Sequence, residues 1–175
     1  YWHIPHINLG IVYEHFENDS MALYHYNNAV SYELYSGYAL KYRGDFYLKK
    51  EEYGKAIEDF KNNIKLSTYY YDAYKGIATG FAGLGNDKEC FQYTLKCIQL
   101  DSVRAIEDVV PISTPFWQNP ALYESGIRYY EELNELLPYS WWIYHNISQL
   151  YKFINNDSLS ESARIKAENL KNTAK

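Results

Sequence analysis

Cysteine is scarce in this 175-residue chain, and its placement argues against a disulfide or metal framework. The two cysteines, Cys90 and Cys97, lie seven positions apart. Along one helix this spacing separates the Cα atoms by about 10 Å, which is too far for a disulfide. A metal site would need further ligands nearby. Both residues are therefore predicted to be reduced, small core residues, which fits a cytosolic setting.

Positive charge and long apolar runs are also lacking. The chain has 17 basic and 22 acidic residues, a formal net charge of -5, and the two signs are interspersed. This gives no extended cationic field for a nucleic acid or an anionic membrane, so neither is an expected partner. No run approaches the roughly 18 to 20 apolar residues that span a bilayer, and no charged-then-apolar signal segment opens the chain.

The chain does not begin with methionine, and its only methionine is Met21. We therefore expect a trimmed fragment from which a targeting signal could be missing. The default expectation for localisation is cytoplasmic.

Apolar and aromatic residues are abundant, at 47% and 18%, and they recur every 34 residues. Residues 37–70 read as one helix-turn-helix unit with the pattern G-x2-Y-x8-A-x3-F-x3-I, formed by Gly44, Tyr47, Ala56, Phe60 and Ile64. The same places one period upstream hold Gly10, Tyr13, Ala22, Tyr26 and Val30. One period downstream they hold Ala78, Phe81, Cys90, Thr94 and Ile98. A period of this length is typical of a helical solenoid.

Glycine in mid-helix costs about 1 kcal/mol relative to alanine, so its recurrence needs a reason. Gly10 and Gly44 begin their patterns at equivalent places, which indicates that the partner helix approaches closely there. Gly85 follows the third such helix and is expected to end it in a left-handed conformation. Asn18, Asn86 and their neighbours are expected to cap the helices that follow.

These features predict an all-α fold, an α-solenoid of antiparallel helix pairs, in a single domain over residues 1–175. The expected repeats, about five, are 3–36, 37–70, 71–104, 107–140 and 141–175. The fourth should be irregular, because residues 111–120 carry three prolines and a short helix from Val103 should end at Pro111. Phe116 and Trp117 would then lie in a proline-rich loop, where they either face a ligand or fill the core. The polar last helix is expected to cap the stack.

With these places named, the chain resembles a tetratricopeptide repeat (TPR) protein, well over residues 3–104 and loosely over 120–173. It departs from the family pattern at Arg43, where a leucine is usual, and at Asn63, where an alanine is usual. The resemblance implies a right-handed stack in which the first helices of the pairs line a concave groove that binds a peptide or a partner protein. It implies no catalysis, and no cofactor is expected.

The groove-facing places of that family can be carried onto this chain. They fall on Ile4, Ile7, Ile11 and Glu14; on Tyr38, Lys41, Asp45 and Leu48; on Asp72, Lys75, Thr79 and Ala82; and on Trp142, His145, Gln149 and Lys152. Tyr42 joins the predicted partner-binding residues because tyrosine offers interfaces a rigid surface with a polar tip. Family members that hold a chaperone's C-terminal carboxylate need a lysine and an asparagine where Ile7 and Ile11 stand, so that ligand is not expected.

Two function hypotheses remain open. The first is a protein-interaction scaffold that holds a segment of another protein in the groove. The alternative is a structural or regulatory repeat module that packs against a neighbouring domain of its own longer chain, with Ile4, Ile7 and Ile11 covering a preceding repeat. His3 and His6 lack further ligands at suitable spacing, so no metal is expected. No nucleophile, base and orienting acid stand at recognisable spacing, which argues against an enzyme.

Overall fold

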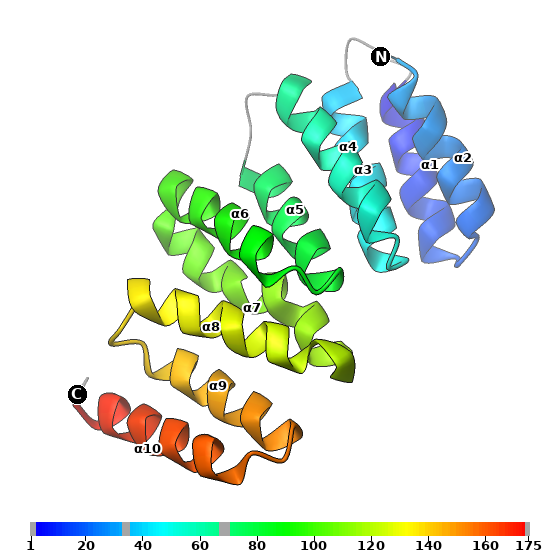
Figure 1. Cartoon of the computed structure of the whole chain (residues 1–175). Coiled ribbons are helices and arrows are strands. Elements are labelled where there is room, and N and C mark those ends of the chain that lie inside the picture. Colours follow the sequence, from blue (N-terminus) through cyan, green and yellow to red (C-terminus); the bar gives the residue numbers. More distant parts are fainter. Residues whose placement is uncertain (1–2, 33–35, 67–70, 174–175) are drawn as a thin grey trace. The chain divides into compact units, whose positions relative to one another are not determined.

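The computed structural model describes residues 3–32, 36–66 and 71–173. Over these ranges the chain forms ten α-helices and no strand (Figure 1), so the predicted all-α repeat class is confirmed. The elements are α1 (His3–His15), α2 (Asp19–Val30), α3 (Ser36–Lys49), α4 (Tyr53–Leu66), α5 (Tyr71–Gly83), α6 (Asp87–Leu100), α7 (Ser102–Gln118), a 3-10 turn (Pro120–Leu122), α8 (Tyr123–Leu136), α9 (Trp141–Phe153) and α10 (Asp157–Thr173).

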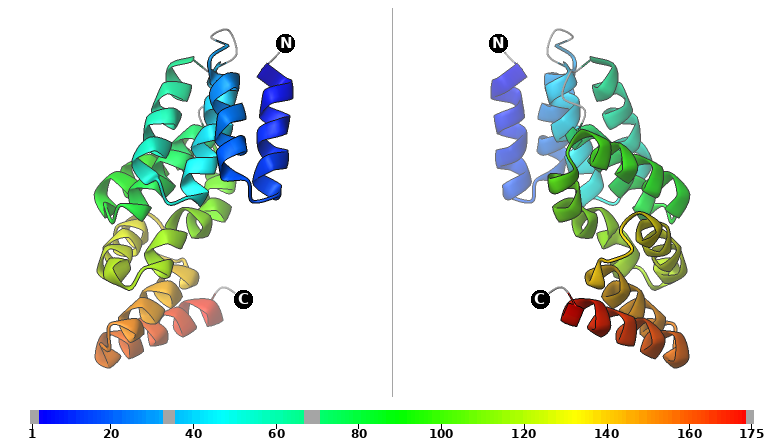
Figure 2. Two further views of the ribbon diagram at one scale, coloured as in Figure 1. Left: turned by 90° about the vertical axis from the view of Figure 1, so that its right-hand side faces the viewer. Right: turned by 90° about the vertical axis from the view of Figure 1, so that its left-hand side faces the viewer.

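The chain divides into two compact units, Tyr1–Gly80 and Phe81–Lys175. In the first unit α1 packs on α2, α2 packs on α3, and α3 packs on α4, while α1 also touches α3. In the second unit α6 contacts α7 and α8, α8 contacts α9, and α9 contacts α10. Paired helices run antiparallel, as α1 with α2 and α9 with α10 show in Figures 1 and 2.

The glycines of the repeat mark close helix contacts in the first unit, as predicted. A Cβ atom on Gly10 would lie only 2.5 Å from the ring of Tyr26 on α2. One repeat later, a Cβ atom on Gly44 would lie 2.9 Å from the ring of Phe60 on α4. Both rings are almost fully buried, so they cannot move aside, and this explains why the mid-helix glycine recurs.

The turn after the first helix of each pair has a recurring backbone shape. Glu17, Glu51 and Gly85 have φ values of 56°, 57° and 73°, and they stand one repeat apart. In each case the amide of the next residue donates a hydrogen bond to the carbonyl of the fifth residue before it, at 2.9 Å. The three bonds run from Asn18 to Tyr13, from Glu52 to Tyr47 and from Asn86 to Phe81. The predicted left-handed Gly85 is confirmed. Asn18 and Asn86 also cap the next helices through their side chains, as expected.

The proline-rich segment is helical, so the prediction of a loop there was wrong. Helix α7 continues through Pro111 and Pro115 to Gln118. Pro111 removes the amide that would bond the Glu107 carbonyl, but both residues are exposed and water can reach that carbonyl. The opposite face of α7 is fully buried through Ala105, Val109, Ile112 and Phe116. Burial of this face stabilises the helix across the prolines.

Phe116 and Trp117 are therefore packing residues of the second unit. The Phe116 ring is fully buried, and its centroid lies 5.6 Å from that of Tyr129. Trp117 packs edge-on against Tyr130 and Phe153. Of the two roles left open for these aromatic residues, the core role is the one the structure adopts.

Both departures from the family pattern form hydrogen bonds between helices. The Arg43 guanidinium on α3 donates to both carboxylate oxygens of Asp59 on α4, each at 2.7 Å, and to Asn27 Oδ1 on α2 at 2.8 Å. The buried Asn63 amide on α4 donates to the Gly37 carbonyl on α3. These polar side chains thus join helices where the family usually has apolar ones.

Candidate functional site

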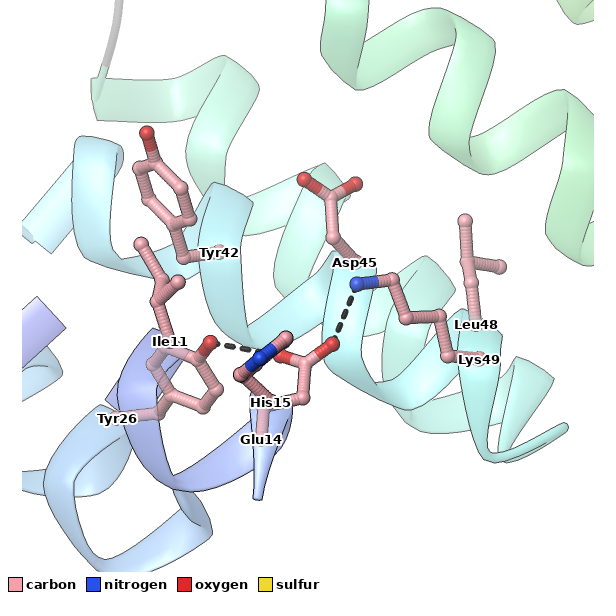
Figure 3. A pocket seen from close by; sticks show the side chains of 8 residues that line it. All are labelled: Ile11, Glu14, His15, Tyr26, Tyr42, Asp45, Leu48 and Lys49. Carbon is pink, nitrogen blue, oxygen red and sulfur yellow. Dashed lines mark hydrogen bonds and ion pairs between the residues drawn. The ribbon is translucent and has the colours of Figure 1, made fainter. Parts of the chain in front are cut away.

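A groove of about 530 Å³ opens in the first unit between α1, α2 and α3 (Figure 3). Helix α2 packs antiparallel on both α1 and α3, so α1 and α3 run in the same direction. Equivalent positions of the repeat on α1 and α3 therefore lie side by side. The lining residues are Ile11, Glu14 and His15 of α1, Tyr26 of α2, and Tyr42, Asp45, Leu48 and Lys49 of α3. The helix-repeat geometry therefore creates a concave site from the first helices of two pairs.

The groove contains four of the predicted partner-binding residues. Ile11, Tyr42, Asp45 and Leu48 all line it, together with Glu14, which the family pattern also placed there. Sequence reasoning missed three other residues, His15, Tyr26 and Lys49. The repeat pattern had assigned Tyr26 to the core, and its ring is indeed buried while its hydroxyl reaches the groove.

The other predicted residues of the first unit do not line the groove itself, although Tyr38 and Lys41 contact residues that do. Ile7 is only 2% exposed and packs in the core with Ala29 and Ala39, because its place on α1 faces the neighbouring helices rather than solvent. Ile4 and Tyr38 are exposed. Lys41 lies beside the groove, and its ammonium is 2.8 Å from Asp45 Oδ2.

The remaining predicted residues are on α5 and α9. Lys75 and Thr79 are half-buried on α5, where the Thr79 hydroxyl donates to the Lys75 carbonyl at 3.0 Å. Trp142, His145 and Gln149 lie on α9 in the second unit, with His145 exposed and the other two half-buried. Their role in binding a partner stays a prediction.

Glu14 is the carboxylate at the base of the groove. It accepts a hydrogen bond from the Tyr26 hydroxyl at 2.8 Å and forms an ion pair with Lys49 (Figure 3). Burial and the hydrogen bond to Glu14 raise the pKa of Tyr26 well above its ordinary value, so this phenol remains a donor. The Glu14 side chain is 16% exposed and that of Lys49 is 66% exposed. The lysine can therefore leave its partner at small cost.

Two tyrosines and a lysine form one edge of the groove. The Tyr38 and Tyr42 hydroxyls are 3.1 Å apart, and this hydrogen bond, together with burial, raises the pKa of Tyr42 to about 12. The Lys41 ammonium lies 4.9 Å from the centroid of the Tyr42 ring. This edge thus places the two phenol rings beside the Lys41–Asp45 ion pair.

Metal ligands, thiols and the length of apolar helices bear on which other functions the described residues could support. They contain no group of three or more histidine, cysteine, aspartate or glutamate side chains that could hold a metal ion. Cys90 and Cys97 are fully buried thiols, and burial raises the pKa of the Cys90 thiol, so it stays protonated. Across the described ranges, every helix is too short or too polar to cross a bilayer.

Comparisons with known proteins establish the fold. No family model matches the sequence, and no curated protein matches it. The crystal structure of MamA protein aligns with a TM-score of 0.64 at 16% identity, over 97% of this chain and 92% of that one. YrrB, described as a TPR protein with an unusual peptide-binding site, aligns with a TM-score of 0.59 at 18% identity, over 95% and 85%. The TPR2AB domain of yeast Sti1 in complex with pHSP90 aligns with a TM-score of 0.51 at 15% identity, over 96% and 77%. The chain therefore has a tetratricopeptide repeat fold, as its sequence predicts.

Proposed function

We propose that this chain is a non-catalytic interaction scaffold that holds a peptide or a segment of a partner protein in the groove between α1 and α3. The observation that carries the proposal is the convergence of Ile11, Tyr42, Asp45 and Leu48 on one cavity, since the sequence alone predicts that these four residues bind a partner. The likeness to YrrB and to the Sti1 domain supports the same class of function. YrrB is described as having a peptide-binding site, and the Sti1 domain is in complex with pHSP90.

The lining favours a ligand that combines an aliphatic and a basic side chain. Ile11 and Leu48 offer apolar contact from opposite sides of the groove. Glu14 and Asp45 supply two carboxylates, and the lysines now paired with them can turn to water when a ligand's lysine or arginine arrives. An internal segment of a partner fits this arrangement better than a C-terminal carboxylate, which two acidic groups would repel.

A displayed library of random peptides tests this proposal. We expect the whole chain to enrich peptides in which an aliphatic residue neighbours lysine or arginine. The double variant Ile11→Ala, Leu48→Ala should reduce capture by tenfold or more, since each buried apolar anchor contributes on the order of 1 kcal/mol. Leu100→Ala is the matched control, because Leu100 is an exposed leucine of α6 in the second unit. Equal capture by the double variant and the wild type would contradict the proposal.

A second candidate function, a repeat module that packs against its own longer chain, rests on a different surface of α1. Leu9, Val12 and Phe16 are 41%, 47% and 74% exposed and lie on one face of the helix. One repeat later the places of Val12 and Phe16 hold Phe46 and Lys50, which contact α2. The exposed face of α1 therefore stands where a preceding helix would pack. Adding the natural upstream segment should raise the melting temperature, and no rise would count against this candidate.

A further inference from the structure

Two histidines face each other where α1 packs on α2. The Nδ1 atoms of His6 and His25 are 2.9 Å apart, a hydrogen-bond distance, and neither residue belongs to the repeat pattern or lines the groove. His25 is 8% exposed. The Tyr13 ring stacks on His25 at 5.3 Å, the Tyr24 ring meets it edge-on at 5.2 Å, and Tyr32 stacks on His6 at 6.2 Å. The pair is thus an aromatic-lined polar contact between two helices.

The number of protons on the pair decides whether it attracts or repels. A hydrogen bond between two Nδ1 atoms needs one of them to carry a proton and the other to accept it. This condition holds when both imidazoles are neutral and when one of them is charged. When both are charged, two N–H groups point at each other across 2.9 Å, the bond is lost and like charges repel. Acidification therefore turns this contact from favourable to unfavourable.

Among the residues that the structure describes, none beside the pair offers a negative charge that would offset the second proton. The titratable side chains in ring contact with the pair are Tyr13 from α1, Tyr24 from α2 and Tyr32 just beyond α2, while Tyr42 of α3 packs on the cluster of Ile7, the residue after His6. Within the described residues, neither His6 nor His25 has an ion pair with a carboxylate. Burial, and secondarily the charge of His6, lower the pKa of His25 below its ordinary value of 6.5.

The lowered pKa fixes the direction of the pH effect on stability. Between the folded pKa of His25 and 6.5, the unfolded chain binds more protons than the folded chain. Stability contributed by this residue is therefore present above 6.5 and falls as the pH drops through that value toward the folded pKa. Most carboxylates titrate well below this range, at about pH 4, so the two effects can be separated.

We propose that His6 and His25 form a pH-sensitive latch that fastens α1 to α2 near neutral pH and loosens it in mild acid. Because α1 supplies Ile11, Glu14 and His15 to the groove, loosening α1 removes one wall of the binding site. The latch thereby makes binding in the groove dependent on pH, and this regulatory consequence rests on the proposed function.

Amide hydrogen exchange on the whole chain tests the latch without any ligand. Protection of the α1 amides, corrected for intrinsic exchange and compared with α4, is measured at about pH 7.5 and about pH 5.5, where carboxylates remain ionised. We expect the wild type to lose severalfold more protection in α1 than in α4 in acid, because the lowered pKa of His25 lets the unfolded chain bind a proton that the folded chain does not. His25→Phe keeps an aromatic ring and removes the titrating group, so its loss should be less than about twofold.

Two further variants complete the test. His6→Gln also removes one titrating member and tests the latch if His25→Phe does not fold. His15→Gln is the matched control for hydrogen exchange alone, because His15 is an exposed histidine of the same helix outside the pair; its α1 protection should respond to pH as that of the wild type does, and since His15 lines the groove the variant is left out of the peptide capture. The latch is overturned if α1 and α4 respond equally in the wild type, or if both pair variants keep the full acid response.

Peptide capture at the same two pH values separates this proposal from the proposed function. Weaker capture in acid by the wild type, with no weakening in His25→Phe, supports control of the groove by the latch. Equal capture at both pH values overturns that control. A pH-dependent α1 without peptide capture at either pH leaves the latch in place and refutes the groove function.

Discussion

Replacing Arg43 should lower the free energy of unfolding more than replacing either residue of an exposed ion pair. Its guanidinium makes two 2.7 Å hydrogen bonds to Asp59, and these bonds raise the pKa of Arg43. The Arg43 side chain is 20% exposed and that of Asp59 only 5%. In Arg43→Met the Asp59 carboxylate would remain buried without its counter-charge. We expect the free energy of unfolding to fall by about 3–5 kcal/mol.

The double variant separates the penalty of an orphaned charge from the net contribution of the pair. In Arg43→Leu, Asp59→Leu both charges are absent, and leucine is the residue usual at the arginine place in the resembling family. Replacing a whole buried pair by apolar residues is often neutral or stabilising. The free energy of unfolding of the double variant should therefore be within about 1 kcal/mol of the wild-type value, or higher than it. The single arginine variant should therefore be rescued by the second change.

Urea unfolding followed by far-ultraviolet circular dichroism measures these differences. The second unit provides the matched comparison, since Arg128 donates to both oxygens of Asp87 at 3.0 and 3.1 Å. The Arg128 side chain is 51% exposed, and Asp87, although only 11% exposed, lies in the first turn of α6, where the helix N-terminus favours a carboxylate; Arg128→Met should therefore cost less, about 1–2 kcal/mol. If Arg43→Met costs no more than Arg128→Met, the reasoning from burial is refuted.

Two predictions concern backbone positions in the first unit, both read from thermal and urea unfolding. Glu51→Gly should raise the free energy of unfolding by about 0.5–1 kcal/mol, because the left-handed strain at Glu51, which has a φ of 57°, exceeds the entropy cost of glycine. A lower free energy of unfolding in this variant would contradict the prediction. Gly10→Ala should cost about 1–2 kcal/mol through the Tyr26 ring 2.5 Å from the new Cβ. Gly54→Ala, with nothing within 4 Å, should instead stabilise by up to about 1 kcal/mol. Equal effects at the two glycines would show that packing does not decide the outcome.

Part of the groove was predictable because it follows from the repeat period. Ile11 and Asp45 stand 34 residues apart, so equivalent places on α1 and α3 must meet on one face once both helices pack on α2. The sequence analysis missed Tyr26 and Lys49 as groove residues. In the repeat, Tyr26 stands at a buried aromatic position and Lys49 at the polar turn between two helices. Which atom of a long side chain reaches a cavity depends on rotamers that a repeat pattern does not contain.

The histidine latch could not have been found by inspecting spacing. His6 and His25 are 19 residues apart and lie on different helices, and only the packing of α1 on α2 brings their nitrogens to 2.9 Å. Sequence reasoning named Ile4, Ile7 and Ile11 as one apolar face of α1, and Ile4 and Ile11 are exposed. Ile7 is in fact a core residue of the first unit.

The sequence by itself determined the helix pairs, the turns between them and the fold, because these depend on local signals repeated at a fixed period. The tertiary structure decided the points where local and packing forces conflict. Helix α7 passes through Pro111 because one complete face of it is buried, and Arg43 replaces an apolar residue because Asp59 lies opposite it. The sequence shows that a proline in a helix or a charge at an apolar position is unfavourable by itself. Whether buried apolar area or a paired charge offsets that free-energy cost depends on contacts that exist only in the packed chain.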